Sequence, residues 1–139
     1  MIFRGKIGYW WWGVLLLMLK ATVDTLNEMD TSSILSLIVG AIVIIVYTIA
    51  VHMTLKNYVI LGDDSLTIFL GVIKKTIFYK DILSIKKTVN PLSSMAISFD
   101  RLEIRARKTS VIIAVKDKPG FVQAVIKRNS KIETTPDLL

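Results

Sequence analysis

The feature that most constrains this chain is an almost unbroken apolar run over residues 34–53, ILSLIVGAIVIIVYTIAVHM, which contains no Asp, Glu, Lys or Arg. A helix of about 20 apolar residues spans the roughly 30 Å hydrocarbon core of a bilayer and satisfies its backbone polar groups internally. In a soluble protein this helix would need protein on every side, and the fewer than 90 residues that follow it cannot supply that. The run therefore predicts a transmembrane helix over residues 33–54.

A second apolar stretch covers residues 7–26. Its uninterrupted part, residues 9–19, is too short to span a bilayer, and the stretch reaches spanning length only by including Lys20 and Asp24. These two lie four residues apart, so they share a helix face and can pair. Three interpretations stay open: a second span, a helix lying in the interface, or a signal peptide. We predict the second span; the lack of a small-residue cleavage site after the apolar core and the span that follows closely argue against a signal peptide.

The distribution of charge predicts the orientation of these segments. Arg4 and Lys6 precede the first stretch, residues 24–33 contain three acidic residues and no cation, and cations are frequent from Lys56 onward. The positive-inside tendency predicts both chain ends in the cytoplasm of the cell and the acidic loop outside. If only the second segment spans, the N-terminus lies outside and the domain after it remains cytoplasmic.

The net charge of +7 belongs to the second part of the chain. Residues 1–52 contain three cations and three anions, so the whole excess lies in residues 53–139. A basic domain held at a membrane favours the anionic inner leaflet as a partner. We expect no nucleic-acid binding, because aromatic residues are not interleaved with the basic ones. The alternative is a solvated basic face without a ligand.

Residue types that several chemistries require are missing from the sequence. There is no cysteine, which excludes disulfides and thiolate sites, and His52 is the single histidine. No metal-ligating cluster surrounds His52 in sequence, and no Ser–His–Asp set or glycine-rich phosphate loop is present. We therefore expect no cofactor, no metal site and no enzymatic activity.

Short strands and one helix are predicted after the apolar segments. Alternating apolar and polar residues separated by turn signals predict six strands, at residues 57–61, 65–70, 72–79, 82–89, 99–107 and 110–115. Asp117 and Pro119 are helix-start signals, and the apolar residues of 121–126 have helical spacing. Residues 129–139 show no periodicity, and we expect a flexible tail there.

The predicted fold class is therefore α+β. Residues 1–56 form a membrane anchor, an N-terminal transmembrane helical hairpin with helices at about 7–26 and 33–54. Residues 57–128 form a small antiparallel β-barrel or sandwich capped by a C-terminal α-helix. This architecture is that of pleckstrin-homology-like (PH-like) domains.

Two segments also resemble a known family. Residues 78–85, FYKDILSI, and residues 90–104, NPLSSMAISFDRLEI, are similar to segments of small membrane-anchored PH-like proteins of Gram-positive bacteria. Lys118–Phe121 resembles the helix start of that family, and the whole chain resembles members that protect a Bacillus producer from its own bacteriocin. The resemblance implies a non-enzymatic immunity protein whose partners are the bilayer and either a bacteriocin peptide or a membrane-protein target. The alternative is a general membrane-tethered interaction scaffold.

Two groups of residues are candidates for binding. Pro91, Ser94, Ser98, Asp100 and Arg101 either shape a turn or line a groove, and turn chemistry explains most of them. The basic candidates for facing the leaflet are Lys56, Lys74, Lys75, Lys86, Lys87, Arg105, Arg107 and Lys108. The loop at residues 62–64 is acidic, whereas a phosphoinositide pocket of the eukaryotic PH type needs a basic loop there. This departure counts against headgroup-specific lipid binding, and it leaves open that the basic clusters respond to membrane charge without specificity.

Overall fold

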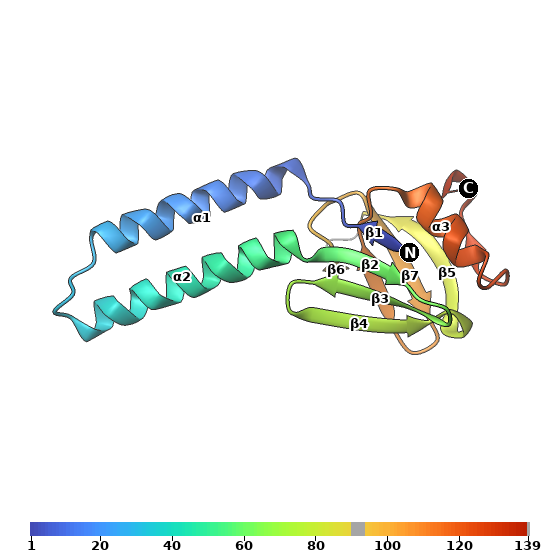
Figure 1. Cartoon of the computed structure of the whole chain (residues 1–139). Coiled ribbons are helices and arrows are strands. Elements are labelled where there is room, and N and C mark those ends of the chain that lie inside the picture. The colour runs from blue at the N-terminus through green and yellow to red at the C-terminus, as the bar shows by residue number, and fades with distance from the viewer. Residues whose placement is uncertain (90–93, 139) are drawn as a thin grey trace.

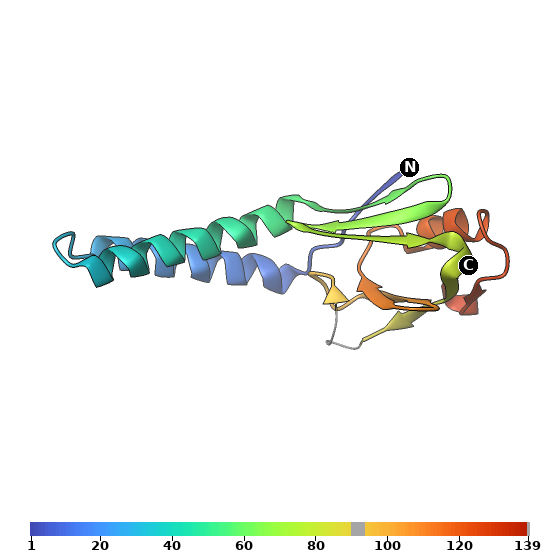
Figure 2. The same cartoon turned by 90° about the horizontal axis from the view of Figure 1, so that it is seen from below.

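The computed structural model describes residues 1–89 and 94–138 and consists of two long helices joined to a β-rich domain (Figure 1). The helices, α1 (Tyr9–Asn27) and α2 (Ile34–Leu55), lie side by side and antiparallel (Figures 1 and 2). The Ser33 side chain caps α2 by accepting a hydrogen bond from the Ser36 N–H. Both helices begin and end within two residues of the predicted positions.

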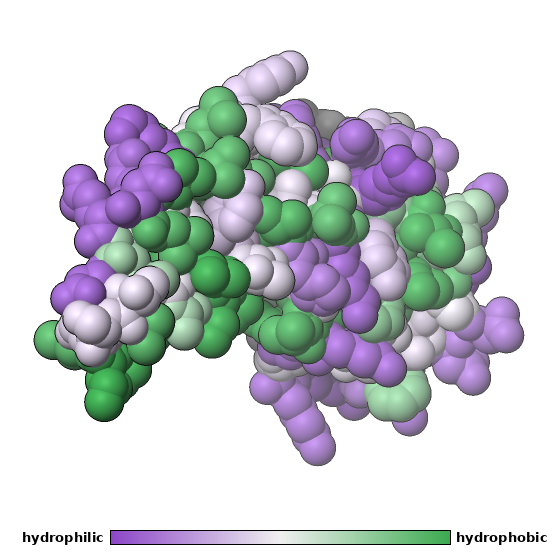
Figure 3. All heavy atoms as spheres, turned by 60° about the vertical axis from the view of Figure 1, so that its left-hand side comes forward, coloured by the Kyte–Doolittle hydropathy of each residue, from purple (hydrophilic) through white to green (hydrophobic). Residues whose placement is uncertain are grey.

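Of the two helices, α2 has the composition of a membrane span. Its mean hydropathy reaches 2.9, and only 11% of its apolar window is buried inside the protein. Among the described residues, no other helix is both long and apolar enough to cross a membrane by these criteria. α1 is less apolar and carries Lys20 and Asp24, which form an ion pair over 2.5 Å. Figure 3 shows hydrophobic side chains gathered over the helix pair, whereas hydrophilic ones are more frequent on the domain.

The first sheet of the domain leads directly on from α2 (Figure 1). It is antiparallel throughout, and its strands follow the order β1 (Ile2–Arg4), β2 (Asn57–Leu61), β3 (Ser65–Leu70) and β4 (Ile73–Phe78). At the β3–β4 turn, Gly71 has a φ of 59° and donates its N–H to the Lys56 carbonyl over 2.7 Å. Glycine is favoured at this φ, and a Cβ would lie 2.7 Å from Met53 Cγ. The turn therefore packs against the end of α2.

β1 was not predicted, and it changes the path of the chain. It pairs with β2 so that Ile2 lies opposite Ile60 and Arg4 lies opposite Tyr58. The chain thus begins inside the domain, leaves it through α1 and returns to it through α2. The helix pair is an insertion between the first two strands, rather than an anchor that precedes the domain.

The second sheet faces the first (Figure 2). Its strands follow the order β6 (Ser94–Met95), β8 (Ser110–Ile113), β7 (Arg101–Ala106), β5 (Ile82–Thr88) and β9 (Glu133–Thr134). The three central strands are antiparallel, whereas the edge strands β6 and β9 pair in parallel. A short 3₁₀ helix, η1 (Tyr79–Asp81), connects β4 with β5 and so joins the two sheets. The six strands predicted from residue 57 onward are confirmed within two residues.

One apolar core lies between the sheets and beneath a helix. α3 (Lys118–Ile126) begins where the Asp117 carboxylate accepts a hydrogen bond from the Gly120 N–H over 3.0 Å, which confirms the predicted start. It buries Phe121, Val122 and Val125 completely. The Phe121 ring meets the ring of Phe3 in β1 edge to face, with centroids 5.4 Å apart. β1 therefore belongs to the core that α3 closes.

The structure differs from the predicted flexible tail. Residues 133 and 134 form β9 beside β5, and a 3₁₀ helix, η2 (Pro136–Leu138), follows it. Ile132 and Leu138 are both buried in the core cluster. Because a two-residue strand and two isolated apolar residues leave no periodic pattern, the sequence gives no sign of this order.

A double substitution tests whether this segment is structural. Replacing Ile132 and Leu138 by alanine should lower the free energy of unfolding by about 4 kcal/mol or more, because each change empties a buried aliphatic site. The measurement is denaturant unfolding of the full chain in mild detergent, followed by β-sheet circular dichroism. Exposed aliphatic residues provide the matched control, L83A/V72A, which should change it by less than about 1 kcal/mol. Equal stability of the two double variants would mean that the tail is not part of the core.

Candidate binding site at the end of the domain away from the helices

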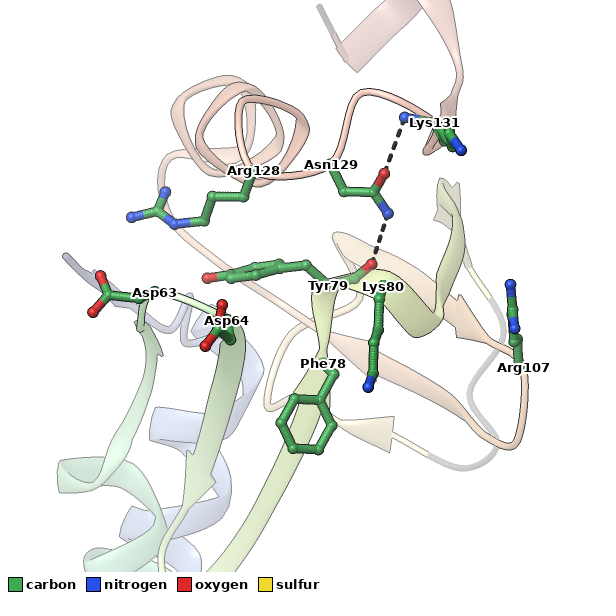
Figure 4. A pocket seen from close by; sticks show the side chains of 9 residues that line it. All are labelled: Asp63, Asp64, Phe78, Tyr79, Lys80, Arg107, Arg128, Asn129 and Lys131. Carbon is green, nitrogen blue, oxygen red and sulfur yellow. Dashed lines mark hydrogen bonds between the residues drawn. The ribbon is translucent and has the colours of Figure 1, made fainter.

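A pocket opens at the end of the domain opposite the helix pair (Figure 4). It has a volume of about 610 Å³ and is open to solvent. Four separate parts of the chain supply its walls: the β2–β3 turn, the end of β4 with η1, the end of β7, and the segment after α3. We call it the distal pocket, and its lining residues are Asp63, Asp64, Phe78, Tyr79, Lys80, Arg107, Arg128, Asn129 and Lys131.

Tyr79 holds the parts of the distal pocket together. Its ring is buried, its hydroxyl donates to the Gly62 carbonyl over 3.0 Å, and its N–H donates to the Asp64 carbonyl over 3.0 Å. These bonds fix the β2–β3 turn relative to the connection between the sheets. Burial raises the pKa of the Tyr79 hydroxyl above its ordinary value, so the hydroxyl remains a donor even in mildly alkaline solution.

The end of α3 is fixed to the same point. The Arg128 guanidinium lies 5.7 Å from the centroid of the Tyr79 ring, and its Nε donates to the Gly62 carbonyl over 3.1 Å. The Asn129 amide donates to the Tyr79 carbonyl over 2.7 Å, and its oxygen accepts the Lys131 N–H over 3.1 Å, as the dashed lines of Figure 4 show. The pocket is therefore preformed by neutral and charge-assisted hydrogen bonds, not by ion pairs.

The walls of the distal pocket carry opposite charges. Asp63 and Asp64 lie in the β2–β3 turn, whereas Lys80, Arg107 and Lys131 come from the other segments. These five residues are exposed, and none of them forms an ion pair with another described residue. Charges that no internal partner neutralises are available to a ligand.

A second hollow continues the cationic wall along the outer face of β5 and β7. It shares Lys80, Arg107, Asn129 and Lys131 with the distal pocket, so the two form one surface. The additional cations are Lys86 and Arg105, and the added carboxylate is that of Glu133 in β9. The combined surface suits a ligand that presents acidic groups over the strands and at least one cation toward the β2–β3 turn.

The residues of the family-like segment lie elsewhere and are held by internal contacts. Asp100 pairs with Lys6 Nζ over 2.7 Å and with Lys118 Nζ. Burial, followed by the nearby charges of Lys87 and Lys6, lowers the pKa of Lys118 to about 8. Asp100 thus joins the segment before α1 to the start of α3 and offsets a local excess of positive charge, instead of accepting backbone N–H groups in a turn.

Arg101 and Ser98 are buried beside it. Arg101 Nε donates to the Ser98 carbonyl over 2.5 Å, and its guanidinium lies 5.4 Å from the Phe99 ring centroid. The Asp100 N–H donates to Ser98 Oγ over 3.3 Å. Of the other candidates, Ser94 lies in β6, and Pro91 lies outside the described residues. The described members of this group shape the approach to β7 and do not line the distal pocket.

The basic candidates divide among separate parts of the surface. Lys56 and Lys74 lie near the end of α2, each with its ammonium within 6 Å of the Phe69 ring centroid. The Lys75 ammonium donates to Thr109 Oγ1 over 2.7 Å and so links β4 to the β7–β8 turn. The remaining candidates lie in the second sheet or in its β7–β8 turn: Lys86, Lys87, Arg105, Arg107 and Lys108. Three of them, Lys86, Arg105 and Arg107, face the surface that includes the distal pocket.

Few features of the sequence pointed to the distal pocket. Asp63 and Asp64 were interpreted as a turn, and Tyr79, Arg128, Asn129 and Lys131 were not singled out. Each lies at the end of an element, where a polar residue is ordinary. The one usable signal was Tyr79, a large aromatic residue at the end of a predicted strand and next to two charged residues, because a buried tyrosine needs a hydrogen-bond partner.

Comparison with known proteins identifies the domain. Residues 56–129, more than half of the chain, match a family model described as Bacterial PH domain. No curated protein and no solved structure matches the chain. The PH-like prediction is therefore confirmed for the domain, whereas no named relative supports the resemblance to immunity proteins. β1, the helix pair and β9 lie outside the matched residues.

Proposed function

Because the chain belongs to the bacterial PH domain family, we propose that it is a membrane-tethered binding module that holds a protein partner in its distal pocket. The family match by itself indicates a membrane- or protein-interaction module. The observation that carries the finer proposal is the position of the distal pocket. The pocket lies beyond the C-terminal end of β2, whereas the N-terminal end of β2 follows directly after the apolar helix α2.

Strand pairing supports an anchor with two spans. Because β1 pairs with β2, the chain leaves the domain before α1 and returns to the same domain after α2. The segment between the two strands can therefore cross a bilayer only an even number of times. At 1.5 Å per residue, α1 and α2 are about 28 and 33 Å long, close to the roughly 30 Å of the hydrocarbon core. The ion pair of Lys20 with Asp24 reduces the cost of placing α1 in lipid.

Charge supports a cytoplasmic domain. Arg4, Lys6 and Lys56 lie where the helix pair meets the domain, whereas Glu28 and Asp30 lie at the far turn. Hydrogen bonds from the Ser32 hydroxyl and N–H lower the pKa of Asp30, which keeps the turn negative. By the positive-inside tendency, the end of the helix pair that joins the domain faces the cytoplasm.

The distal pocket suits a protein better than a lipid headgroup. β2 is five residues long, so its far end lies about 17 Å beyond its start at the end of α2. Two carboxylates on one wall also oppose a phosphate group. A protein segment with charges of both signs complements both walls, and such complementarity gives specificity.

Photo-crosslinking in membranes tests this proposal. With benzoylphenylalanine in place of Phe78, which lines the pocket, we expect one discrete protein adduct of the full chain. R107E/K131E should reduce that adduct at least tenfold, because it reverses two cations of the cationic wall. The matched control is K108E/K127E, which makes the same charge change on exposed residues outside the lining and should keep the adduct. Equal losses in both double variants, or no adduct at all, would contradict a protein site in this pocket.

A second role follows from the resemblance of the whole chain to immunity proteins. We propose that the partner is either an incoming bacteriocin or the membrane protein that the bacteriocin attacks, so that the module protects the cell by binding. The support is the sequence resemblance together with a domain held at the membrane where such a peptide arrives.

Sensitivity to a bacteriocin tests this role separately. The full chain, expressed in a sensitive Bacillus strain, should raise the inhibitory concentration of sublancin, the bacteriocin of the immunity protein that the chain resembles, at least fourfold. R107E/K131E should abolish this protection, and K108E/K127E should retain it. Unchanged sensitivity with the native chain would exclude protection against this peptide and would leave the binding module itself intact.

A further inference from the structure

Two grooves meet where the helix pair joins the domain. The first, of about 550 Å³, lies between the start of α1, the end of α2 and strands β1 and β2. The second, of about 350 Å³, runs between α1 and α2. Trp12, Thr54 and Leu55 line both of them, so together they form one continuous groove, which we call the junction groove.

The domain end of the junction groove is cationic. The Lys116 N–H donates to the Arg4 carbonyl over 3.1 Å, and the adjacent Gly5–Val115 bridge is antiparallel. Arg4 and Lys116 are therefore cross-strand neighbours on one face. Both side chains are exposed and line the groove, and neither forms an ion pair within the described part of the chain.

Asn57 adds a hydrogen-bond donor without a partner at this cationic end. Its side-chain nitrogen is buried and makes no hydrogen bond with any described residue. The amide lies directly over Gly5, where even a Cβ would come within about 2 Å of it. A buried donor without an acceptor costs about 1–3 kcal/mol. An oxygen of a ligand in the groove would remove that cost.

The other end of the junction groove is almost entirely apolar. Its walls are Trp12, Leu16 and Leu19 of α1 and Tyr47 and Val51 of α2. The hydroxyl of Thr54, at the boundary, already accepts the indole N–H of Trp11 over 2.7 Å. The polarity therefore changes from cationic to apolar along one continuous groove, in the direction from the domain into the helix pair.

We propose that the junction groove holds one anionic phospholipid, with its phosphate against Arg4, Lys116 and Asn57 and one acyl chain between α1 and α2. This inference rests on the proposed membrane anchor, because the cationic end then lies at headgroup depth. Arginine forms paired hydrogen bonds with phosphate oxygens, and hydrocarbon fills the apolar part. A free phosphate would use only the cationic end. The groove also lies at the opposite end of β2 from the acidic 62–64 turn, so it differs from a headgroup site at that turn.

Native mass spectrometry of the purified full chain in detergent tests the proposal. With added phosphatidylglycerol, the native chain should retain one lipid at concentrations at least tenfold below those needed for phosphatidylcholine of the same chain length. Inorganic phosphate at millimolar concentration should not displace it. Equal retention of the two lipids would overturn the proposal without the use of any variant, and displacement by phosphate would reduce it to a simple anion site.

Variants in which glutamine replaces two cations locate the site. R4Q/K116Q should weaken phosphatidylglycerol retention about 10- to 30-fold, given the loss of two cations at the headgroup level. The matched control is K56Q/K74Q, which removes two cations near the same end of α2 but outside the groove, and it should weaken retention less than threefold. Equal weakening by both variants would mean that surface charge in general, and not the junction groove, attracts the lipid.

Vesicle flotation separates the failure of this inference from that of the membrane anchor. A chain that does not float with vesicles contradicts the anchor and the lipid site together. A chain that floats but retains phosphatidylglycerol no better than phosphatidylcholine contradicts the lipid site alone. Circular dichroism of each variant shows whether the domain remains folded.

Discussion

The pairing of β1 with β2 is the contact on which the rest of the structure depends. Three residues near the start of the chain lie beside the strand that follows α2. The pairing continues at both ends, where the Leu61 N–H donates to the Met1 carbonyl and the Gly5 N–H donates to the Asn57 carbonyl. The two helices between these strands must leave and re-enter the domain at the same edge. This closure brings Trp11 to Thr54, whose hydroxyl accepts the indole N–H over 2.7 Å, and so holds the two helices together where they meet the domain.

Because of this closure, the domain has two ends with different surroundings. At one end, the junction groove combines Arg4 and Lys116 with the apolar surface between the helices. At the other end, the distal pocket presents acidic and basic walls that are fixed by Tyr79 and Arg128. Cations therefore contribute to two separate surfaces of the domain, and the described basic candidates are spread over the domain instead of forming one continuous patch.

The elements that could be predicted from the sequence are those with a strong local pattern of residues. The uninterrupted apolar run predicted α2, alternation predicted the strands from residue 57 onward, and Asp117 predicted the start of α3. β1 and β9 were not predicted, because two or three residues paired with distant partners carry no period. The sites were hard to predict for the same reason, because their residues come from segments that lie far apart in the sequence. Asp100 looked like a turn residue, yet its partners Lys6 and Lys118 come from distant segments, and no local motif contains the four segments of the distal pocket.

Labelling of single cysteines tests the central claim, that the helix pair crosses the membrane twice and keeps the domain in the cytoplasm. The chain contains no cysteine, so T31C in the turn between the helices and K108C in the domain can each be labelled alone. A membrane-impermeant maleimide applied to intact cells should label T31C, and it should label K108C only after the membrane is broken. Labelling of K108C in intact cells, or labelling of T31C only after lysis, would contradict this account.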